Sequence, residues 1–381
     1  MEDKHKKNRP SGGLWLTALF LCFAISLDAA TLLSPPRDFS DSENRTLAQA
    51  PIFSPDSLRN GAFTDGAERF FSDQFAFRDT WTSLAFYGRT LLGQREINGV
   101  WIGADNYLFL IPSDPNETEL ARNLDAVNLF AETHSELRHS MAVIPNAAYV
   151  MSHRLPRYAS APDQRAQLGQ IAACLEDVAF IDVTDTLLTH RNERLYYRTD
   201  HHWTSLGAYY AFAPIAAALD FDISTAQYVI YTVSENFEGT LSSKSGSHTA
   251  KDTIEIYVPR TDTDYNVTYS DGSGTEASLY QKQFLDTKDQ YAVFLGGNHP
   301  LIDIRTTADT ERRLLLVKDS YANCLVPFLT PYFEEIVIID PRFSYDTAES
   351  IVNQYGVTDV LYLYNADTFQ TDTSLADFLT A

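Results

Sequence analysis

Three short and almost wholly apolar runs near the C-terminus constrain the fold more than any other feature of the chain. They are Leu314–Val317, Ile336–Ile339 and Val360–Leu363, and segments of helical periodicity separate them. Strands that are apolar along their whole length are buried on both faces, which is typical of parallel sheets covered by helices. The alternation therefore predicts an α/β fold with a mostly parallel sheet.

Similar patterns occur earlier in the chain. Residues 100–102 and 107–111 flank a polar turn and predict a hairpin, and residues 117–137 have helical periodicity. Short apolar runs follow at 141–144 and 180–183. Thr204 or Ser205 is placed to cap a helix that runs to Leu219. From about residue 221 to 290, β-type runs alternate with polar stretches, which predicts a β-rich insertion.

The N-terminus reads as an export signal or a membrane anchor over residues 1–33. An uncharged run from Ser11 to Leu27 continues past Asp28 to Leu33, close to the roughly 20 residues that span a bilayer. A signal-peptidase site is hard to place, since a cut after Ala30 puts Asp28 at position −3. We therefore expect a single-pass anchor with the rest of the chain extracytoplasmic; the alternative is a cleaved signal and a secreted protein. Four basic residues precede the run: Lys4, Lys6, Lys7 and Arg9.

Residues 34–95 predict a stalk followed by helices, and residues 96–381 the main domain. Ser34 to Asp56 is rich in Pro, Ser, Asp and Asn, which favours an extended segment. From Gly61 to Leu92, aromatic and aliphatic residues recur every three to five positions, which predicts amphipathic helices.

Charge and cysteine content exclude several classes of function. The chain has 51 acidic against 29 basic residues, a formal net charge of −22, and such a surface repels nucleic-acid backbones. Its three cysteines show neither a disulfide framework nor zinc-ligand spacing. We expect no nucleic acid, metal or other cofactor.

Asp200-His201-His202-Trp203 is the first segment with the residues for chemistry. A carboxylate that holds one ring nitrogen of a histidine leaves the other nitrogen free as a general base. Asp200 and His202 can form such a pair. For His201 we expect a structural role with a hydrogen bond to backbone.

Ser320 is the candidate nucleophile, because it follows the apolar run that ends at Val317. A serine after a parallel strand lies at the sheet edge where α/β proteins hold ligands, and a following helix offers N–H groups to an oxyanion. It can also be a plain helix cap. Candidate oxyanion or substrate-binding residues are Asn146, Gly297, Asn298 and Asn323.

At these residues the chain resembles the DHHW family, which in turn looks like the SGNH-hydrolase-like alginate O-acetyltransferases. The resemblance implies a three-layer SGNH-hydrolase-like sandwich and a triad in the order Asp200, His202, Ser320. It departs at Lys318, where GDS-type hydrolases have glycine, and this affects the oxyanion geometry. Further blocks that look like the family are Ser42–Arg45, Ser72–Asp79, Ile97–Gly103 and Lys318–Asn323.

The resemblance implies an O-acetyltransferase that modifies a cell-surface polysaccharide, with a membrane-bound O-acyltransferase as the partner that supplies acetyl groups. Two alternatives stay open: an esterase with the same triad and water as acceptor, and a non-catalytic protein that binds a surface polymer. A metal site at Asp200-His201-His202, as in the DHH phosphoesterases, lacks the further aspartate motifs that such a site needs.

Overall fold

Two compact units make up the chain in the computed structural model, Met1–Leu91 and Leu92–Ala381. The structure describes residues 12–40, 42–43, 45–261, 263–272 and 274–381. The basic residues before the apolar run, and Asp41 and Asn44 of the expected stalk, lie outside the described residues.

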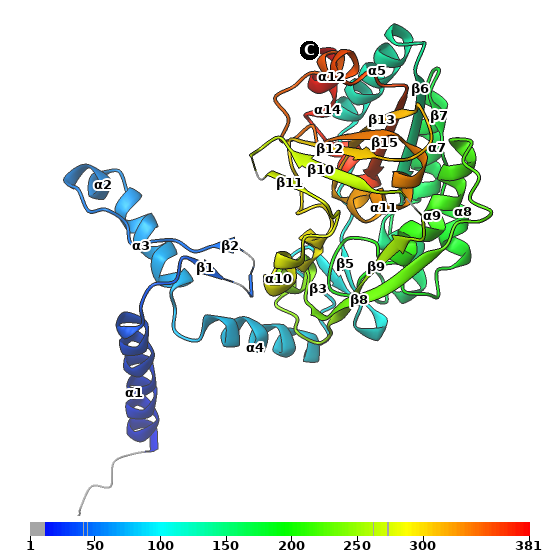
Figure 1. The fold of residues 1–381 in the computed structure, drawn as a ribbon. Helices are drawn as coiled ribbons and strands as arrows, with labels where there is room; N and C mark the ends of the chain where they lie inside the picture. Colours follow the sequence, from blue (N-terminus) through cyan, green and yellow to red (C-terminus); the bar gives the residue numbers. More distant parts are fainter. Residues whose placement is uncertain (1–11, 41, 44, 262, 273) are drawn as a thin grey trace, which may run out of the picture. The chain divides into compact units, whose positions relative to one another are not determined.

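An eight-stranded sheet forms the centre of the second unit (Figure 1). The five strands from β14 to β7 run parallel, and β12, β10 and β11 continue the sheet antiparallel beyond β14. The α/β fold with a mostly parallel sheet is confirmed. In spatial order the strands are β11 (Gly274–Glu276), β10 (Tyr265–Tyr269), β12 (Leu301–Thr306), β14 (Glu335–Ile339), β13 (Arg313–Lys318), β15 (Asp359–Asn365), β6 (Arg138–Ile144) and β7 (Ala179–Phe180).

Both faces of this sheet are buried, which makes the unit a three-layer structure. Along β13, Leu314 and Leu316 belong to one core, and Leu315 and Val317 belong to the other, because successive side chains of a strand point to opposite faces. The first core packs on α6 (Ala147–Val150), α8 (Thr184–Thr189), α9 (Ser205–Ala218) and α11 (Val326–Leu329). The second packs on α5 (Glu117–Thr133), α7 (Gln164–Cys174), α12 (Ala348–Tyr355), α13 (Ala366–Thr371) and α14 (Leu375–Thr380).

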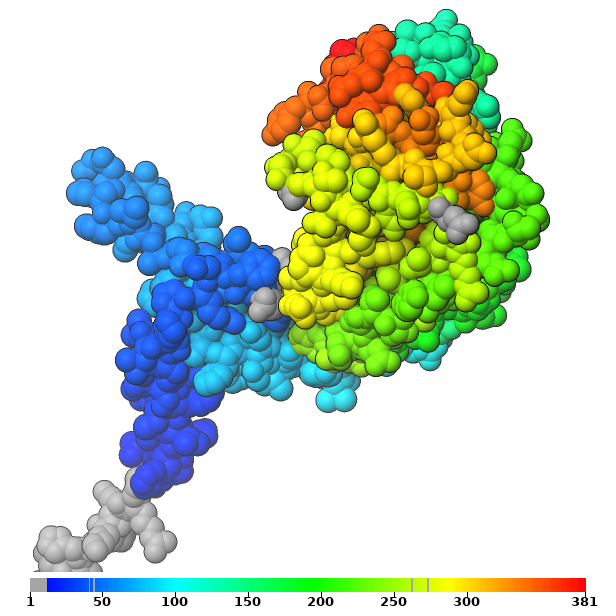
Figure 2. All heavy atoms as spheres, in the orientation of Figure 1, coloured from blue at the N-terminus to red at the C-terminus, as the bar shows by residue number. Residues whose placement is uncertain are grey.

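The β-rich region from 221 to 290 divides between two sheets. Strands β8 (Tyr228–Phe237) and β9 (Asp252–Pro259) form a separate hairpin, with α10 (Thr240–Ser245) between them. By contrast, β10 and β11 extend the main sheet, since β10 pairs with its edge strand β12. Figure 2 shows this region, in green to yellow, over much of the visible face of the unit.

Two local predictions are confirmed beside the sheet. A three-stranded meander of β3 (Glu96–Ile97), β4 (Val100–Ile102) and β5 (Leu108–Leu110) contains the expected hairpin. Its turn places Asp105 and Asn106 at positive φ, which short polar side chains tolerate. Thr204 caps α9, and its hydroxyl accepts from the Gly207 N–H.

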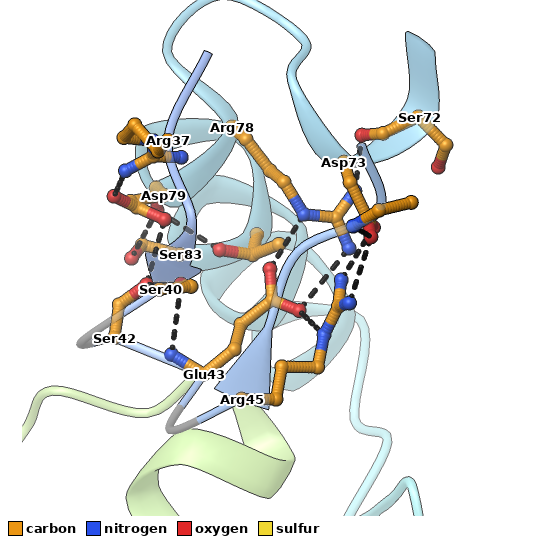
Figure 3. A network of polar contacts seen from close by, with 12 residues as sticks. Arg37, Ser40, Ser42, Glu43, Arg45, Ser72, Asp73, Arg78, Asp79 and Ser83 are labelled. Atoms are coloured by element: carbon orange, nitrogen blue, oxygen red, sulfur yellow. Dashed lines mark hydrogen bonds and ion pairs between the residues drawn. The ribbon is translucent and has the colours of Figure 1, made fainter. Parts of the chain in front are cut away.

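The first unit begins with α1 (Gly12–Leu33), which is long and apolar enough to cross a membrane, with a mean hydropathy of 2.0. A two-stranded ribbon of β1 (Phe39–Ser40) and β2 (Arg45–Thr46) follows, and then α2 (Pro55–Arg59), α3 (Ala62–Asp73) and α4 (Arg78–Leu91). The helices expected between 61 and 92 are present. The expected stalk instead turns back on itself, because ion pairs from Glu43 and Arg45 tie the ribbon to α3 and α4 (Figure 3).

Candidate active site

The polar residues of the site lie at the carboxyl edge of the parallel strands. Asn146 follows β6, Asp319 and Ser320 follow β13, and Asn365 ends β15. These strands are neighbours in the order β13, β15, β6, so their ends lie side by side. This is the edge at which α/β sheets hold ligands.

Ser320, His202 and Asp200 form a continuous chain of hydrogen bonds. His202 Nε2 lies 2.7 Å from Ser320 Oγ, and His202 Nδ1 lies 2.6 Å from Asp200 Oδ1. Asp200 and His202 are buried, whereas Ser320 is partly exposed. Because the carboxylate accepts at Nδ1, that nitrogen carries the proton and Nε2 is left to accept from the serine hydroxyl. The structure thus brings the three predicted residues together.

The start of α10, which the sequence analysis did not single out, holds the Asp200 carboxylate. Asp200 Oδ2 accepts from the backbone N–H and the hydroxyl of Thr240, at 2.8 and 2.9 Å. Burial alone would raise the pKa of Asp200, but His201, His202 and the hydrogen bonds from His202 and Thr240 hold it well below its usual range. Gly239 packs so closely that a Cβ there would lie 2.3 Å from the Asp200 Cβ.

Two aromatic residues fix the histidine and the serine turn. Tyr291 stacks on the His202 ring, with centroids 3.9 Å apart, and its hydroxyl donates to the Ser320 carbonyl at 3.2 Å. Burial raises the pKa of Tyr291 far above its usual value, which keeps this donor protonated. Trp203 is fully buried and donates from Nε1 to the Tyr321 carbonyl at 2.8 Å. Trp203 therefore joins the Asp-His-His-Trp segment to the serine turn.

Ser320 begins a short 3₁₀ helix, Ser320–Cys324, at the place where a helix was expected. Asp319 caps this turn, since its Oδ1 accepts from the Tyr321 N–H at 2.9 Å and its carbonyl accepts from the Ala322 N–H. Asp319 Oδ2 also accepts from the Asn365 N–H, which ties the turn to β15. The N–H groups of Tyr321 and Ala322 already donate to Asp319, so other groups have to donate hydrogen bonds to an oxyanion.

Asn146 is the oxyanion candidate that shares a cavity with the Asp200 segment. It lines a cavity of about 20 Å³, room for one water, together with Asp200, His201, Tyr321, Asn365 and others. Its side-chain oxygen accepts from Asn365 at 2.6 Å, and its Nδ2 donates to Asp367 at 2.7 Å. An amide nitrogen has two hydrogens, so one remains for a ligand.

The other three candidates, Gly297, Asn298 and Asn323, gather around Lys318 instead. Lys318 is fully buried, and its Nζ donates to Asn298 Oδ1 at 2.8 Å and lies 3.7 Å from Asp340 Oδ2. Asn323 donates to the Gly297 carbonyl at 3.2 Å. Lys318, at the position where GDS-type hydrolases have glycine, therefore holds the loop of Gly297 and Asn298 beside the serine turn.

His201 lies against His202, with ring centroids 4.0 Å apart, and its Nδ1 is 2.9 Å from the Thr240 hydroxyl. Its partner is thus a side chain, where a backbone group was expected. Burial and the adjacent His202 lower its pKa, so it is neutral near pH 7. Within the described part of the chain, Asp200, His201 and His202 are the one group of side chains placed to hold a metal ion, with ligand atoms within 4.8 Å of one another.

A family model for DHHW proteins matches residues 142–339, slightly more than half of the chain. The chain belongs to the DHHW family. The matched region contains Asp200, His202 and Ser320 and ends with β14. No curated protein matches the chain by sequence.

Solved structures share this fold. A DHHW family protein from Eubacterium siraeum is 27% identical, with a TM-score of 0.63, over 74% of this chain and 95% of that one. PatB1 from Bacillus cereus is 19% identical, with a TM-score of 0.60, over 72% of this chain and 97% of that one. PatB1 with a sulfonyl adduct gives a TM-score of 0.61 at the same identity, over 73% and 99%.

Sequence reasoning missed Gly239, Thr240 and Tyr291. Gly239 and Thr240 lie in the region of about 221–290, which was predicted only as a β-rich insertion, and Tyr291 follows directly after it. Glycine next to threonine is common in loops, and a tyrosine among 21 carries no local signal. These residues act by close packing across the site, which the sequence does not show.

Proposed function

We propose that this DHHW protein is an extracytoplasmic O-acetyltransferase that modifies a cell-surface polysaccharide. The observation that carries the proposal is the hydrogen-bonded series from Ser320 Oγ through His202 to Asp200. A buried carboxylate that fixes the histidine tautomer is the arrangement that activates a serine. The assignment of Ser320 as nucleophile and of Asn146 as oxyanion donor belongs to this proposal.

In the proposed reaction, Ser320 Oγ attacks the acetyl carbonyl while His202 Nε2 takes the hydroxyl proton. The bond to the donor oxygen breaks, and His202 returns the proton to that leaving group. A sugar hydroxyl then attacks the acetyl-serine, His202 takes its proton, and the same proton restores Ser320. Asp200 remains ionised throughout and stabilises the imidazolium.

The acetyl donor, the acceptor and the location are also proposals. Acetyl-CoA is not expected outside the cell, so we propose that a membrane-bound O-acyltransferase supplies the acetyl group. We further propose that α1 (Gly12–Leu33) remains as a single-pass anchor, with Lys4 to Arg9 in the cytoplasm and residues 34–381 outside. Fractionation tests this: a mature protein that starts near residue 30 and is soluble would show a cleaved signal and a secreted enzyme.

Covalent labelling tests the nucleophile. Incubation with p-nitrophenyl acetate should add one acetyl group to the peptide that contains Lys318–Asn323, and a sulfonyl fluoride should block it. Ser320→Ala should lose the label and stay folded, whereas Ser135→Ala, an exposed serine outside the site, should keep it. A label on another peptide, or full turnover by Ser320→Ala, would falsify the assignment and favour a polymer-binding role.

Histidine variants separate this mechanism from a metal site. His202→Ala should lose acylation, while His201→Ala should still acylate Ser320, because only His202 reaches the serine hydroxyl. Equal loss in both variants, reversed by added divalent metal, would support metal ligation by Asp200, His201 and His202 instead. Release of acetate to water at the same rate with and without polysaccharide would identify an esterase.

A further inference from the structure

Helix α4 carries an exposed apolar stripe on one side. Phe77, directly before the helix, and Trp81, Leu84 and Leu91 are 67%, 37%, 54% and 89% exposed. At about 100° per residue, Trp81, Leu84 and Leu91 lie within an arc of about 80° on the helix. The charged residues of the helix, Arg78, Asp79 and Arg89, all lie outside that arc.

The other side of α4 is fixed to the rest of the unit by polar contacts. Asp79 accepts from Ser42 at 2.6 Å and from Arg37 at 3.0 Å, and Arg78 Nε donates to Glu43 at 2.6 Å (Figure 3). These contacts hold the helix in one rotation about its axis. The stripe is thus a stable feature of the surface of this unit.

The stripe starts beside the end of the apolar helix α1. The Ala76 N–H donates to the hydroxyl of Thr31 in the last turn of α1, at 3.0 Å. The Trp81 ring contacts Phe23 of α1 edge to face, with centroids 6.4 Å apart. Phe23 lies eight residues before Thr31, about 12 Å along α1, so if α1 crosses the bilayer, the Trp81 ring reaches inward from the outer boundary near Thr31.

Charge distinguishes this unit from the rest of the chain. Residues 34–91 have eight acidic and six basic side chains, whereas residues 92–381 have 40 and 19. A nearly neutral unit with aromatic residues on one helix face suits the lipid interface, and a strongly acidic unit does not. Arg89, on the flank of the stripe, is exposed and can reach lipid phosphates.

We propose that α4 lies in the interface of the bilayer that α1 crosses, with Phe77, Trp81, Leu84 and Leu91 in contact with lipid. The inference rests on the proposed membrane anchor and is independent of the acyl-transfer chemistry. Residues 34–91 are then a unit that lies at the membrane surface.

Spin labels on the full chain test this placement. Cys22 and Cys174 are replaced by serine, buried Cys324 is kept, and a nitroxide is attached in Leu84→Cys or, as the matched control on the flank, Arg89→Cys. Both proteins are reconstituted into vesicles of phosphatidylcholine and phosphatidylglycerol, and each must keep the circular dichroism spectrum and the cooperative unfolding of the unlabelled chain. For each label, the measured quantity is the ratio of collisions with oxygen to collisions with a water-soluble nickel complex. This ratio should be at least about threefold higher at position 84 than at position 89.

Three other results of the spin-label experiment would each overturn the proposal. Equal nickel accessibility at 84 and 89 would place the stripe in water. Shielding of position 84 from both oxygen and nickel would show that protein, rather than lipid, covers it. Recovery of the chain apart from the vesicles would remove the anchor together with this inference, and Ser320 acylation would still be open to measurement.

Discussion

At the scale of single residues, Gly239 is the most tightly constrained position of the site. An added Cβ would lie 2.3 Å from the Asp200 Cβ and 2.4 Å from its Oδ2. Gly239→Ala should therefore displace the carboxylate, lower the free energy of unfolding by about 1–3 kcal/mol and slow Ser320 acylation. Denaturant titration and ester hydrolysis measure the two effects.

Gly169→Ala is the control, because no heavy atom lies within 4 Å of an added Cβ at that position of α7. It should stabilise the helix by about 0.5–1 kcal/mol and leave acylation unchanged. If Gly239→Ala behaved like this control, the close contact with Asp200 would not be a constraint in solution.

Lys318 gives a second prediction at this scale, on the pH dependence of stability. Burial lowers the pKa of Lys318 to about 8, against the attraction of Asp340 and Asp319. Between pH 8 and the unfolded value of about 10.4, the unfolded chain binds more protons at this site, so this lysine makes stability rise with pH. Lys318→Met should remove that rise.

The measurement is the difference in unfolding free energy between wild type and Lys318→Met across pH 7 to 10, since buried tyrosines contribute equally to both. Lys282→Met, at an exposed position, is the control and should give a flat difference. A flat difference for Lys318→Met as well would mean that burial does not lower the pKa of Lys318 in solution.

At the scale of elements, the pairing of Arg45 with Asp73 links the β1–β2 ribbon to α3. The Arg45 hydrogen bonds lower the pKa of Asp73 to about 2, even though burial opposes this. The stability from this pair is therefore complete above the unfolded pKa near 4 and is lost as the pH falls through 2. Amide exchange in residues 62–73 should increase over that range, after correction for intrinsic rates.

Asp73→Asn should already show the faster exchange at pH 5 and should change little on acidification. Asp56→Asn is the matched control, because the Asp56–Arg59 pair in α2 is exposed and contributes little. Similar behaviour of the two variants would mean that the ribbon is held by something other than Arg45 and Asp73.

At the scale of the whole molecule, charge is distributed unevenly between the units. With 40 acidic and 19 basic side chains, residues 92–381 have a formal net charge of −21. A polyanionic acceptor is repelled at long range, and salt screens this repulsion over a Debye length of about 10 Å at 0.1 M. KM for a polyanionic polysaccharide should thus fall several-fold as salt rises from about 0.02 to 0.2 M.

For a neutral polysaccharide, KM should be independent of salt over the same range, which provides the control. KM for each polymer is measured by monitoring acetyl transfer through the release of a coloured leaving group from the acetyl donor. A KM for the polyanion that increased with salt would reveal a local cationic site for the acceptor within the acidic unit.

The sequence determined the α/β layering of this protein. Runs such as Leu314–Val317 are apolar at every position, and such runs are stable only with both faces covered, so the pattern specifies a central parallel sheet without any tertiary information. The spacing of Asp200 and His202 likewise allows a local carboxylate-imidazole pair, and the strand before Ser320 places that serine at the sheet edge.

Tertiary structure decided which residues meet across the chain. Ser320 is 118 positions from His202, and Trp203 and Tyr291 bring the two turns together through packing that leaves no periodic signal. The oxyanion candidates separated, with Asn146 beside the cavity and Asn298 on Lys318, because strand order rather than sequence sets neighbours at the sheet edge. The expected stalk folds back for the same reason, since Arg45 pairs with Asp73 of α3, 28 positions further along the chain.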